Sequence, residues 1–320
     1  MPVVEIDNLT KDFFVGFWKK RPVRALDHLS LEVHRGEIFG FLGPNGAGKS
    51  TTLKILMQLL HPTSGEARIL GKPVDCVTMR RSIGYLPENP HFYDYLTPVE
   101  LLTYMGELFG LRQPELGRRV DSLLDQAGLA DARHLQLRKY SKGMVQRVGI
   151  AQAILNDPEV VFLDEPMSGL DPLGRMDVRR IITSLKARGT TVFFSSHILP
   201  DVEAICDRVA ILNRGRLHEI GALADILKVR IEGHEVILAG WTPEMLESLQ
   251  KFCEELRPMG DRLHLRVDAP ERLEKLLAFA FARRLELISV NPVRPSLEEY
   301  FHSAVEGGEN GTDSGELRDG

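Results

Sequence analysis

The sequence predicts an α/β protein of two unequal parts, the larger one built on a parallel sheet. From residue 1 to about 220, short apolar runs alternate with helical patterns, as in α/β domains. Between about 95 and 157 the pattern is nearly all helical, which indicates a helical subdomain inserted into that domain. After about 220 a new set of strand and helix patterns begins, and its length is typical of a small appended domain.

Several short segments of the larger part have strand composition. The runs 160–163 and 191–194 are continuously apolar, which is typical of parallel strands buried on both faces. A-I-L-N-R-G-R-L at 210–217 predicts a hairpin with its turn at Arg214-Gly215. The other predicted strands are 3–6, 29–33 and 37–42.

Two helix starts in the larger part have clear signals. Residues 49–60 have helical periodicity and stop at His61-Pro62. T-P-V-E at 97–100 is a capping box with proline at the first helical position, so we expect a helix to begin there. Apolar residues follow it at helical spacing: Leu101, Leu102, Met105, Leu108 and Phe109.

The smaller part is predicted as an α/β module over 221–304. We expect strands at 235–238, 263–267 and 285–290, and helices at 243–256 and 270–283. Residues 305–320 are rich in glycine and acidic side chains and almost free of apolar ones. Such a segment buries too little surface to order, so it is predicted to be a disordered acidic tail.

Composition argues against several classes of protein. The 320 residues carry a net charge of -5, which argues against a dedicated nucleic-acid binder. Cys76, Cys206 and Cys253 are far apart and lack metal-ligand spacing, so we expect neutral thiols. The N-terminus lacks a signal-peptide pattern, and no window approaches the roughly 18–20 apolar residues that span a bilayer. Action at a membrane would therefore require a partner.

The stretch G-P-N-G-A-G-K-S-T fits the phosphate-binding loop G-x-x-x-x-G-K-[ST], with a strand pattern before it and a helix pattern after it. Glycines let backbone N–H groups surround nucleotide phosphates, and the helix N-terminus favours negative charge. The lysine would reach the β- and γ-phosphates, and the serine hydroxyl would bind Mg²⁺. The predicted nucleotide-binding residues here are Gly43, Pro44, Asn45, Gly46, Ala47, Gly48, Lys49, Ser50 and Thr51.

A second metal carboxylate is expected beside such a loop. V-V-F-L-D-E-P places Asp164 at the C-terminal end of a buried strand, the end at which α/β sheets bind ligands. Asp164 suits a Mg²⁺ ligand, and Glu165 suits a general base that orients the attacking water. Standing alone, the pair would be read as two acids that cap a strand.

The segment Y-S-K-G-M-V-Q-R at 140–147 precedes a helical apolar run. The Ser141 hydroxyl and the Gly143 N–H would converge at a helix N-terminus, which is a natural phosphate site, although Ser141 alone is more often a simple helix cap. The segment stands in a fixed order with three other features. These are the phosphate loop before it, and D-E with S-G-L-D-P (168–172) and F-F-S-S-H after it.

That order resembles the nucleotide-binding domain of the ABC ATPase family over residues 1–220. The usual signature L-S-G-G-Q reads Y-S-K-G-M here, keeping the serine and the second glycine. The resemblance implies a P-loop NTPase of ABC ATPase type, with an N-terminal antiparallel β subdomain, the inserted helical subdomain and the C-terminal module. It also implies that two such domains pack head to tail, each ATP being held by one phosphate loop and the other chain's signature helix. This chain would form a homodimer, or a heterodimer with a relative.

The resemblance implies roles for further residues. Asp171 lies in the loop that communicates between the two sites, and His197 would contact the γ-phosphate and help position the water. Glu88 replaces the usual glutamine that senses Mg²⁺ and the water. Phe13 is the best positional match for the aromatic that stacks on adenine; Phe14, Phe17 and Trp18 are alternatives, which could equally serve in packing or in a membrane-facing basic and aromatic loop.

P-S-L-E-E-Y-F at 295–301 resembles the end of the appended domain in ATPase subunits of bacterial drug, lipid and polysaccharide exporters. The combined resemblance implies a subunit that hydrolyses ATP with Mg²⁺ and powers a separate integral membrane permease at the cytoplasmic face of the plasma membrane. The face near 88–109 would dock that permease, and its helix could instead be ordinary core. One alternative is a soluble ABC ATPase that acts on nucleic acid or ribosomes; another is a small-molecule kinase.

Overall fold

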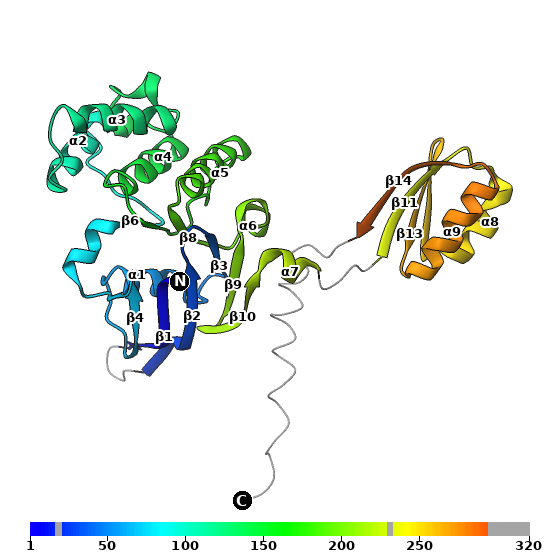
Figure 1. Ribbon diagram of the computed structural model, residues 1–320, viewed down its shortest axis with the longest axis horizontal. Helices are drawn as coiled ribbons and strands as arrows, with labels where there is room; N and C mark the ends of the chain where they lie inside the picture. Colours follow the sequence, from blue (N-terminus) through cyan, green and yellow to red (C-terminus); the bar gives the residue numbers. More distant parts are fainter. Residues whose placement is uncertain (17–20, 229–232, 294–320) are drawn as a thin grey trace, which may run out of the picture. The chain divides into compact units, whose positions relative to one another are not determined.

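The computed structural model describes residues 1–16, 21–228 and 233–293. The chain divides into two compact units, Met1–Leu223 and Ala224–Gly320 (Figure 1). Three sequence predictions lie outside the described residues: the motif at 295–301, the tail at 305–320, and the alternatives Phe17 and Trp18 for the adenine-stacking aromatic.

The N-terminal unit is organised around a six-stranded sheet in the order β10-β9-β3-β8-β7-β6. Every described neighbour pair in it is parallel except the β9–β10 hairpin. The central strands consist entirely of buried residues, as their continuous apolar composition predicted. The strands are β3 (Ile38–Leu42), β6 (Ile83–Leu86), β7 (Val160–Leu163), β8 (Thr191–Ser196), β9 (Arg208–Asn213) and β10 (Arg216–Ala222).

A second sheet of the N-terminal unit is antiparallel, in the order β2-β1-β4-β5. Its strands are β1 (Pro2–Val15), β2 (Arg21–His34), β4 (Ser64–Ile69) and β5 (Lys72–Pro73). The predictions of short strands at 3–6 and 29–33 were too short. Cross-strand pairing extends each strand to 14 residues, through register shifts and as far as Val15 opposite Arg21. Apolar periodicity marks only the part of each strand that packs on the core.

Helices flank the parallel sheet, and three of them form the predicted helical subdomain (Figure 1). The capping box at Thr97 is present as predicted, with reciprocal bonds between Thr97 and Glu100. The helix predicted at 49–60 ends at Leu56, because Gln58 has a φ of 56° that no α-helix accommodates. The helices of this unit are α1 (Lys49–Leu56), α2 (Pro98–Leu108), α3 (Glu115–Gln126), α4 (Lys142–Ala153), α5 (Pro172–Ala187) and α6 (Leu199–Ile205), with 3₁₀ turns Val77–Ser82, Ala130–Ala132 and Leu137–Lys139. Helix α7 (Leu223–Lys228) begins at the boundary between the two units.

The C-terminal unit is a four-stranded antiparallel sheet, ordered β12-β13-β11-β14, with its own apolar core. Its strands are β11 (Gly233–Ala239), β12 (Glu255–Met259), β13 (Arg262–Val267) and β14 (Glu286–Val293). Its helical segments are α8 (Leu246–Leu249), α9 (Pro270–Ala282) and the 3₁₀ turns Pro243–Met245 and Gln250–Phe252.

The helix predicted at 243–256 was wrong over its last four residues. Helical turns end at Phe252, and the next residues form β12, which pairs with β13 across a turn at Gly260. Pro258 cannot continue a helix, and it is tolerated here because β12 is an edge strand. Among the described residues of both units, no helix combines the length and apolar character needed to cross a bilayer.

Candidate active site

The phosphate loop joins the central strand β3 to helix α1, as its motif predicted. Gly46 and Gly48 have φ values of 82° and 108°, in the region that favours glycine. A Cβ on Gly48 would lie 2.6 Å from Leu26 Cδ2 and 2.7 Å from the Ala25 carbonyl oxygen. The loop therefore passes so close to β2 that only glycine fits at position 48.

Lys49 begins α1 and is the cation of this loop. Its ammonium group donates to the carbonyl oxygens of Gly43 at 2.7 Å and Pro44 at 3.3 Å. It also lies 3.2 Å from Glu165 Oε1, and both side chains are more than nine-tenths buried. Burial weakens the screening of this ion pair, so the charge of Lys49 acts strongly on neighbouring groups.

Asp164 follows β7 and is 2 % exposed. Its Oδ1 accepts hydrogen bonds from Ser50 Oγ at 3.1 Å and Ser195 Oγ at 2.7 Å. Burial raises the pKa of the Asp164 carboxyl, and the bonds from Ser195 and Ser50 partly oppose this rise. A hydroxyl and a buried carboxylate joined in this way form an oxygen-ligand pair that suits Mg²⁺.

Glu165 has a φ of 49°, which turns it out of the strand direction that Asp164 continues. Its backbone N–H donates to Ser195 Oγ at 2.9 Å. One carboxylate oxygen faces Lys49, and the other lies 2.8 Å from His197 Nδ1. Glu165 is thus held between a lysine of the phosphate loop and a histidine that follows β8.

These side chains line a cavity of about 490 Å³. Its wall contains most of the predicted phosphate loop together with Glu88, Glu165 and His197. Phe13 does not line it: Phe13 pairs with Val23 in the β1–β2 hairpin, and the Lys11 ammonium lies 5.2 Å from its ring centroid. Ala25 is the residue of β2 that reaches the cavity, so adenine stacking by an aromatic stays a prediction.

Sequence reasoning missed Ser195 and Ser168. Ser195 is fully buried and joins the two carboxylate residues, since it donates to Asp164 and accepts from the Glu165 N–H. The signal was present in F-F-S-S-H, where a hydroxyl ends a strand adjacent to β7. Ser168 lines the 490 Å³ cavity directly.

Ser141, Gly143 and Asp171 lie elsewhere, around a second cavity of about 380 Å³ that we call the Ser141 cavity. Ser141 caps α4 by accepting from the Met144 N–H at 3.3 Å, and Asp171 caps α5 by accepting from the Gly174 N–H at 2.9 Å. The two cavities share no lining residue. One chain therefore separates the predicted nucleotide-binding residues into two groups.

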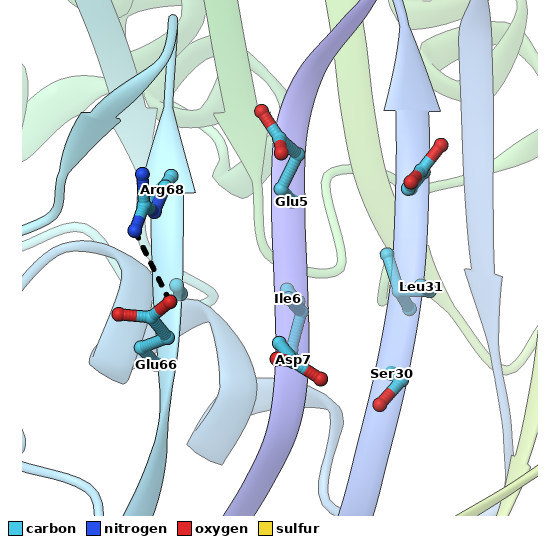
Figure 2. Close-up of a pocket in the computed structure, with 9 residues that line it drawn as sticks. Glu5, Ile6, Asp7, Ser30, Leu31, Glu66 and Arg68 are labelled. Carbon is cyan, nitrogen blue, oxygen red and sulfur yellow. Dashed lines mark hydrogen bonds and ion pairs between the residues drawn. The ribbon is translucent and has the colours of Figure 1, made fainter.

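A third hollow of about 500 Å³ lies on the open face of the β2-β1-β4 sheet (Figure 2). Carboxylates dominate it: Glu5, Asp7 and Glu66 line it with Glu32, and Arg68 pairs with Glu66. Such a surface repels phosphate, so this hollow does not compete with the 490 Å³ cavity as a nucleotide site.

A family model described as ABC transporter matches residues 26–168, which include the phosphate loop, the Ser141 segment and the Asp164–Glu165 pair. An uncharacterized ABC transporter ATP-binding protein of Synechocystis is 50% identical over 93% of this chain and 83% of its own length. The chain belongs to the ABC transporter ATP-binding proteins. ATP hydrolysis is general in this family. The solved structures similar to this chain are ABC transporter ATP-binding subunits and cassettes, which confirms the predicted ABC ATPase fold.

Two further similarities extend this result. The bacitracin transport ATP-binding protein BcrA of Bacillus licheniformis is 35% identical over 89% of this ABC protein and 94% of its own length. A solved dimeric structure of the ATP-binding cassette MJ0796, in a post-hydrolysis state bound to ADP and Pi, superposes with a TM-score of 0.63. That structure is 26% identical and covers 69% of this chain and 98% of its own.

Proposed function

We propose that this chain is the ATP-hydrolysing subunit of an ABC exporter, that it works as a dimer and that it powers a separate membrane permease. The observation that carries the proposal is the position of Glu165 between Lys49 at 3.2 Å and His197 at 2.8 Å, on the wall of the 490 Å³ cavity. A phosphate group in that cavity would meet a cation, a carboxylate and an imidazole at once.

The residues divide the work of phosphoryl transfer among them. Lys49 and the N–H groups at the start of α1 attract the β- and γ-phosphates and stabilise the charge of the transferring group. Glu165 accepts a hydrogen bond from the attacking water and takes its proton, and His197 helps to orient that water at the γ-phosphate. Ser195 holds Glu165 through its backbone N–H.

The donor set fits Mg²⁺. Ser50 and Asp164 already lie within hydrogen-bond distance of each other, and Glu88 lines the same cavity, so these three would hold the ion. When bound, Mg²⁺ neutralises charge on the β- and γ-phosphate oxygens. Glutamate at position 88 supplies a full negative charge at this site, whereas the glutamine usual in the family supplies none.

The two cavities support a dimer. Ser141 and Gly143 stand at the N-terminus of α4, yet they line a cavity separate from the phosphate loop of the same chain. A second copy, or a relative, would supply its own α4 N-terminus to the first chain's ATP. The dimeric MJ0796 cassette supports this arrangement by similarity.

Transport is supported by the similarity to BcrA and by one exposed surface. From Glu88 to the C-cap of α2 the chain exposes large apolar side chains: Tyr93, Tyr95, Tyr104, Leu108 and Phe109. We assign this surface as the dock for a permease, which would place the chain at the cytoplasmic face of the plasma membrane. The C-terminal unit would then be the accessory domain of an exporter-type subunit.

The test is a pull-down from native membranes with the Glu165→Gln variant in ATP and Mg²⁺, which should hold the dimer closed. Stoichiometric recovery of a polytopic membrane protein supports the transporter. A Tyr104→Glu variant on the same background serves as the control. It should no longer recover the membrane protein, and it should still bind ATP. Recovery of only soluble or ribosomal material would overturn the transport proposal and leave the ATPase intact.

A further inference from the structure

Asp201 is a buried carboxylate that the proposed chemistry does not use. It lies on α6, four residues after His197, and it is 0 % exposed. Arg179 of α5 donates to its Oδ1 through both Nε, at 3.1 Å, and Nη2. Its Oδ2 has no hydrogen-bond partner among the described residues. A buried carboxylate oxygen without a donor is costly, so its position calls for a reason.

Arg175, one turn before Arg179 on α5, lies between the Asp201 carboxylate and the loop that precedes α5. Its Nη1 is 4.0 Å from Asp201 Oδ2, within ion-pair range but beyond hydrogen-bond range. Its Nε donates to the Leu170 carbonyl oxygen at 3.2 Å. A single guanidinium therefore contacts both the helix that follows His197 and the loop that precedes α5.

That loop, residues 168–171, reaches both cavities. Ser168 lines the cavity of the phosphate loop, whereas Leu170 and Asp171 line the Ser141 cavity. The side chain of Lys142 lies over Gly169, where a Cβ would come 2.3 Å from its Nζ. The loop thus lies against the side chain of Lys142 of α4 at Gly169 and is bonded to Arg175 of α5 at Leu170.

We propose that Arg175 is a positioning residue that couples the His197 segment to the 168–171 loop, and so couples the two half-sites that one chain carries. This inference rests on the proposed ATPase function. A γ-phosphate at His197 would shift α6, which begins two residues later, and Asp201 would move with it because it lies on that helix. Bringing Arg175 Nη1 to within about 2.9 Å of Asp201 Oδ2 would satisfy the orphaned oxygen. Since Nε of the same planar group is bonded to Leu170, the loop must follow.

The two contacts of Arg175 determine which substitutions test its role. Arg175→Ala removes both contacts, and Arg175→Lys keeps the charge but cannot bond Leu170 and Asp201 together. Arg180→Ala is the matched control, since Arg180 lies on the same helix, is largely exposed and pairs only with Asp177 among the described residues. We expect Arg175→Ala and Arg175→Lys to lower kcat about tenfold with KM for ATP unchanged within about twofold. Arg180→Ala should match the wild type, and all three should keep its Tm within a few degrees.

Hydrogen exchange separates this inference from the proposed function. On the Glu165→Gln background, ATP with Mg²⁺ should protect both the phosphate loop, 43–51, and the segment 168–174. Adding Arg175→Ala should abolish the second protection and keep the first. Protection of 168–174 that survives in the double variant, an unchanged kcat, or a joint fall in Tm and rise in KM would each overturn the coupling role. If ATP fails to protect 43–51 even with Arg175 present, the proposed function fails and the coupling falls with it.

Discussion

The ammonium group of Lys49 lies 3.2 Å from Glu165 Oε1, and both side chains are more than nine-tenths buried. Removing one partner of such a buried pair leaves the other without its counter-charge in the interior. The pair joins the start of α1 to the end of β7, which approach each other only in the folded chain. Its consequences for binding and turnover can be separated by substitution.

Glu165→Gln should leave ATP binding intact and reduce turnover by about 10²–10⁴-fold, the usual contribution of a positioned general base. The amide removes the negative partner of Lys49, so the lysine becomes freer to meet phosphate, and the Kd for ATP should stay equal or fall. Equilibrium binding and steady-state ATPase assays measure the two effects. Turnover near the wild-type rate would remove Glu165 from the role of base.

Ser195→Ala should reduce both turnover and stability, because Ser195 links the backbone of Glu165 to the carboxylate of Asp164. Leaving the Glu165 N–H without a partner in the interior should cost about 1–3 kcal/mol in the free energy of unfolding. Urea denaturation and ATPase assays measure the losses.

Ser196→Ala is the matched control for Ser195→Ala. Ser196 is equally buried, but its hydroxyl bonds Ile198 and contacts neither carboxylate. It should lose stability with much less effect on kcat. Equal losses of kcat in the two variants would show that Ser195 acts only through packing.

A composite site predicts complementation between two inactive variants. Lys49→Ala disables the phosphate loop, and Ser141→Arg disables the α4 N-terminus. Random pairing of equimolar chains makes half of the dimers mixed, each with one intact site, so about a quarter of the wild-type rate should return. Lys49→Ala mixed with Glu165→Gln is the control and should stay inactive, since both changes affect the same half-site. No recovery in the first mixture would contradict a site shared between chains.

Asp27 should make the free energy of unfolding depend on pH in the acid range. Hydrogen bonds from Arg216, His28 and Arg24 lower the pKa of Asp27 to about 2, so the folded state favours the charged form. Its contribution is present above the unfolded pKa of about 3.9 and is lost as pH falls toward 2. Asp27→Asn should therefore be less stable than the wild type at pH 7, and the difference should shrink below pH 4.

Urea denaturation at pH 7, 4 and 3 would measure the Asp27 effect. Asp7→Asn is the control, because the only side chain that Asp7 bonds among the described residues is its neighbour Asn8. A gap between wild type and Asp27→Asn that is constant over this range would show that the ion pair with Arg216 contributes nothing through charge.

Local motifs were enough to predict much of the site. G-P-N-G-A-G-K-S-T needs only a strand before it and a helix after it, and β3 and α1 provide both. The D-E pair follows a continuously apolar strand, so its position at the ligand-binding edge of the sheet follows from the rule for α/β folds. In these cases the signal lies within a few residues of the group that it places.

Longer-range features were less accessible. The β1–β2 hairpin extends well past its apolar stretches, because pairing between strands rather than periodicity decides where it ends. The predicted helix reached residue 256, yet 255–259 form an edge strand because β13 pairs with them. Strand pairing of this kind depends on whether a neighbouring segment also becomes a strand, and the apolar periodicity of one segment alone does not report that.

The amino-acid sequence by itself determined the family and the phosphate-loop motif, and it supplied the groups that we propose bind ATP and Mg²⁺. The spacing of residues within a motif can be read from the sequence without knowing the fold. Tertiary structure alone decided that Ser195 joins Asp164 to Glu165, that Phe13 stays outside the 490 Å³ cavity, and that Ser141 lines a different one. These relations depend on which strands become neighbours, and the free energy that selects those neighbours comes from the packing of the whole core.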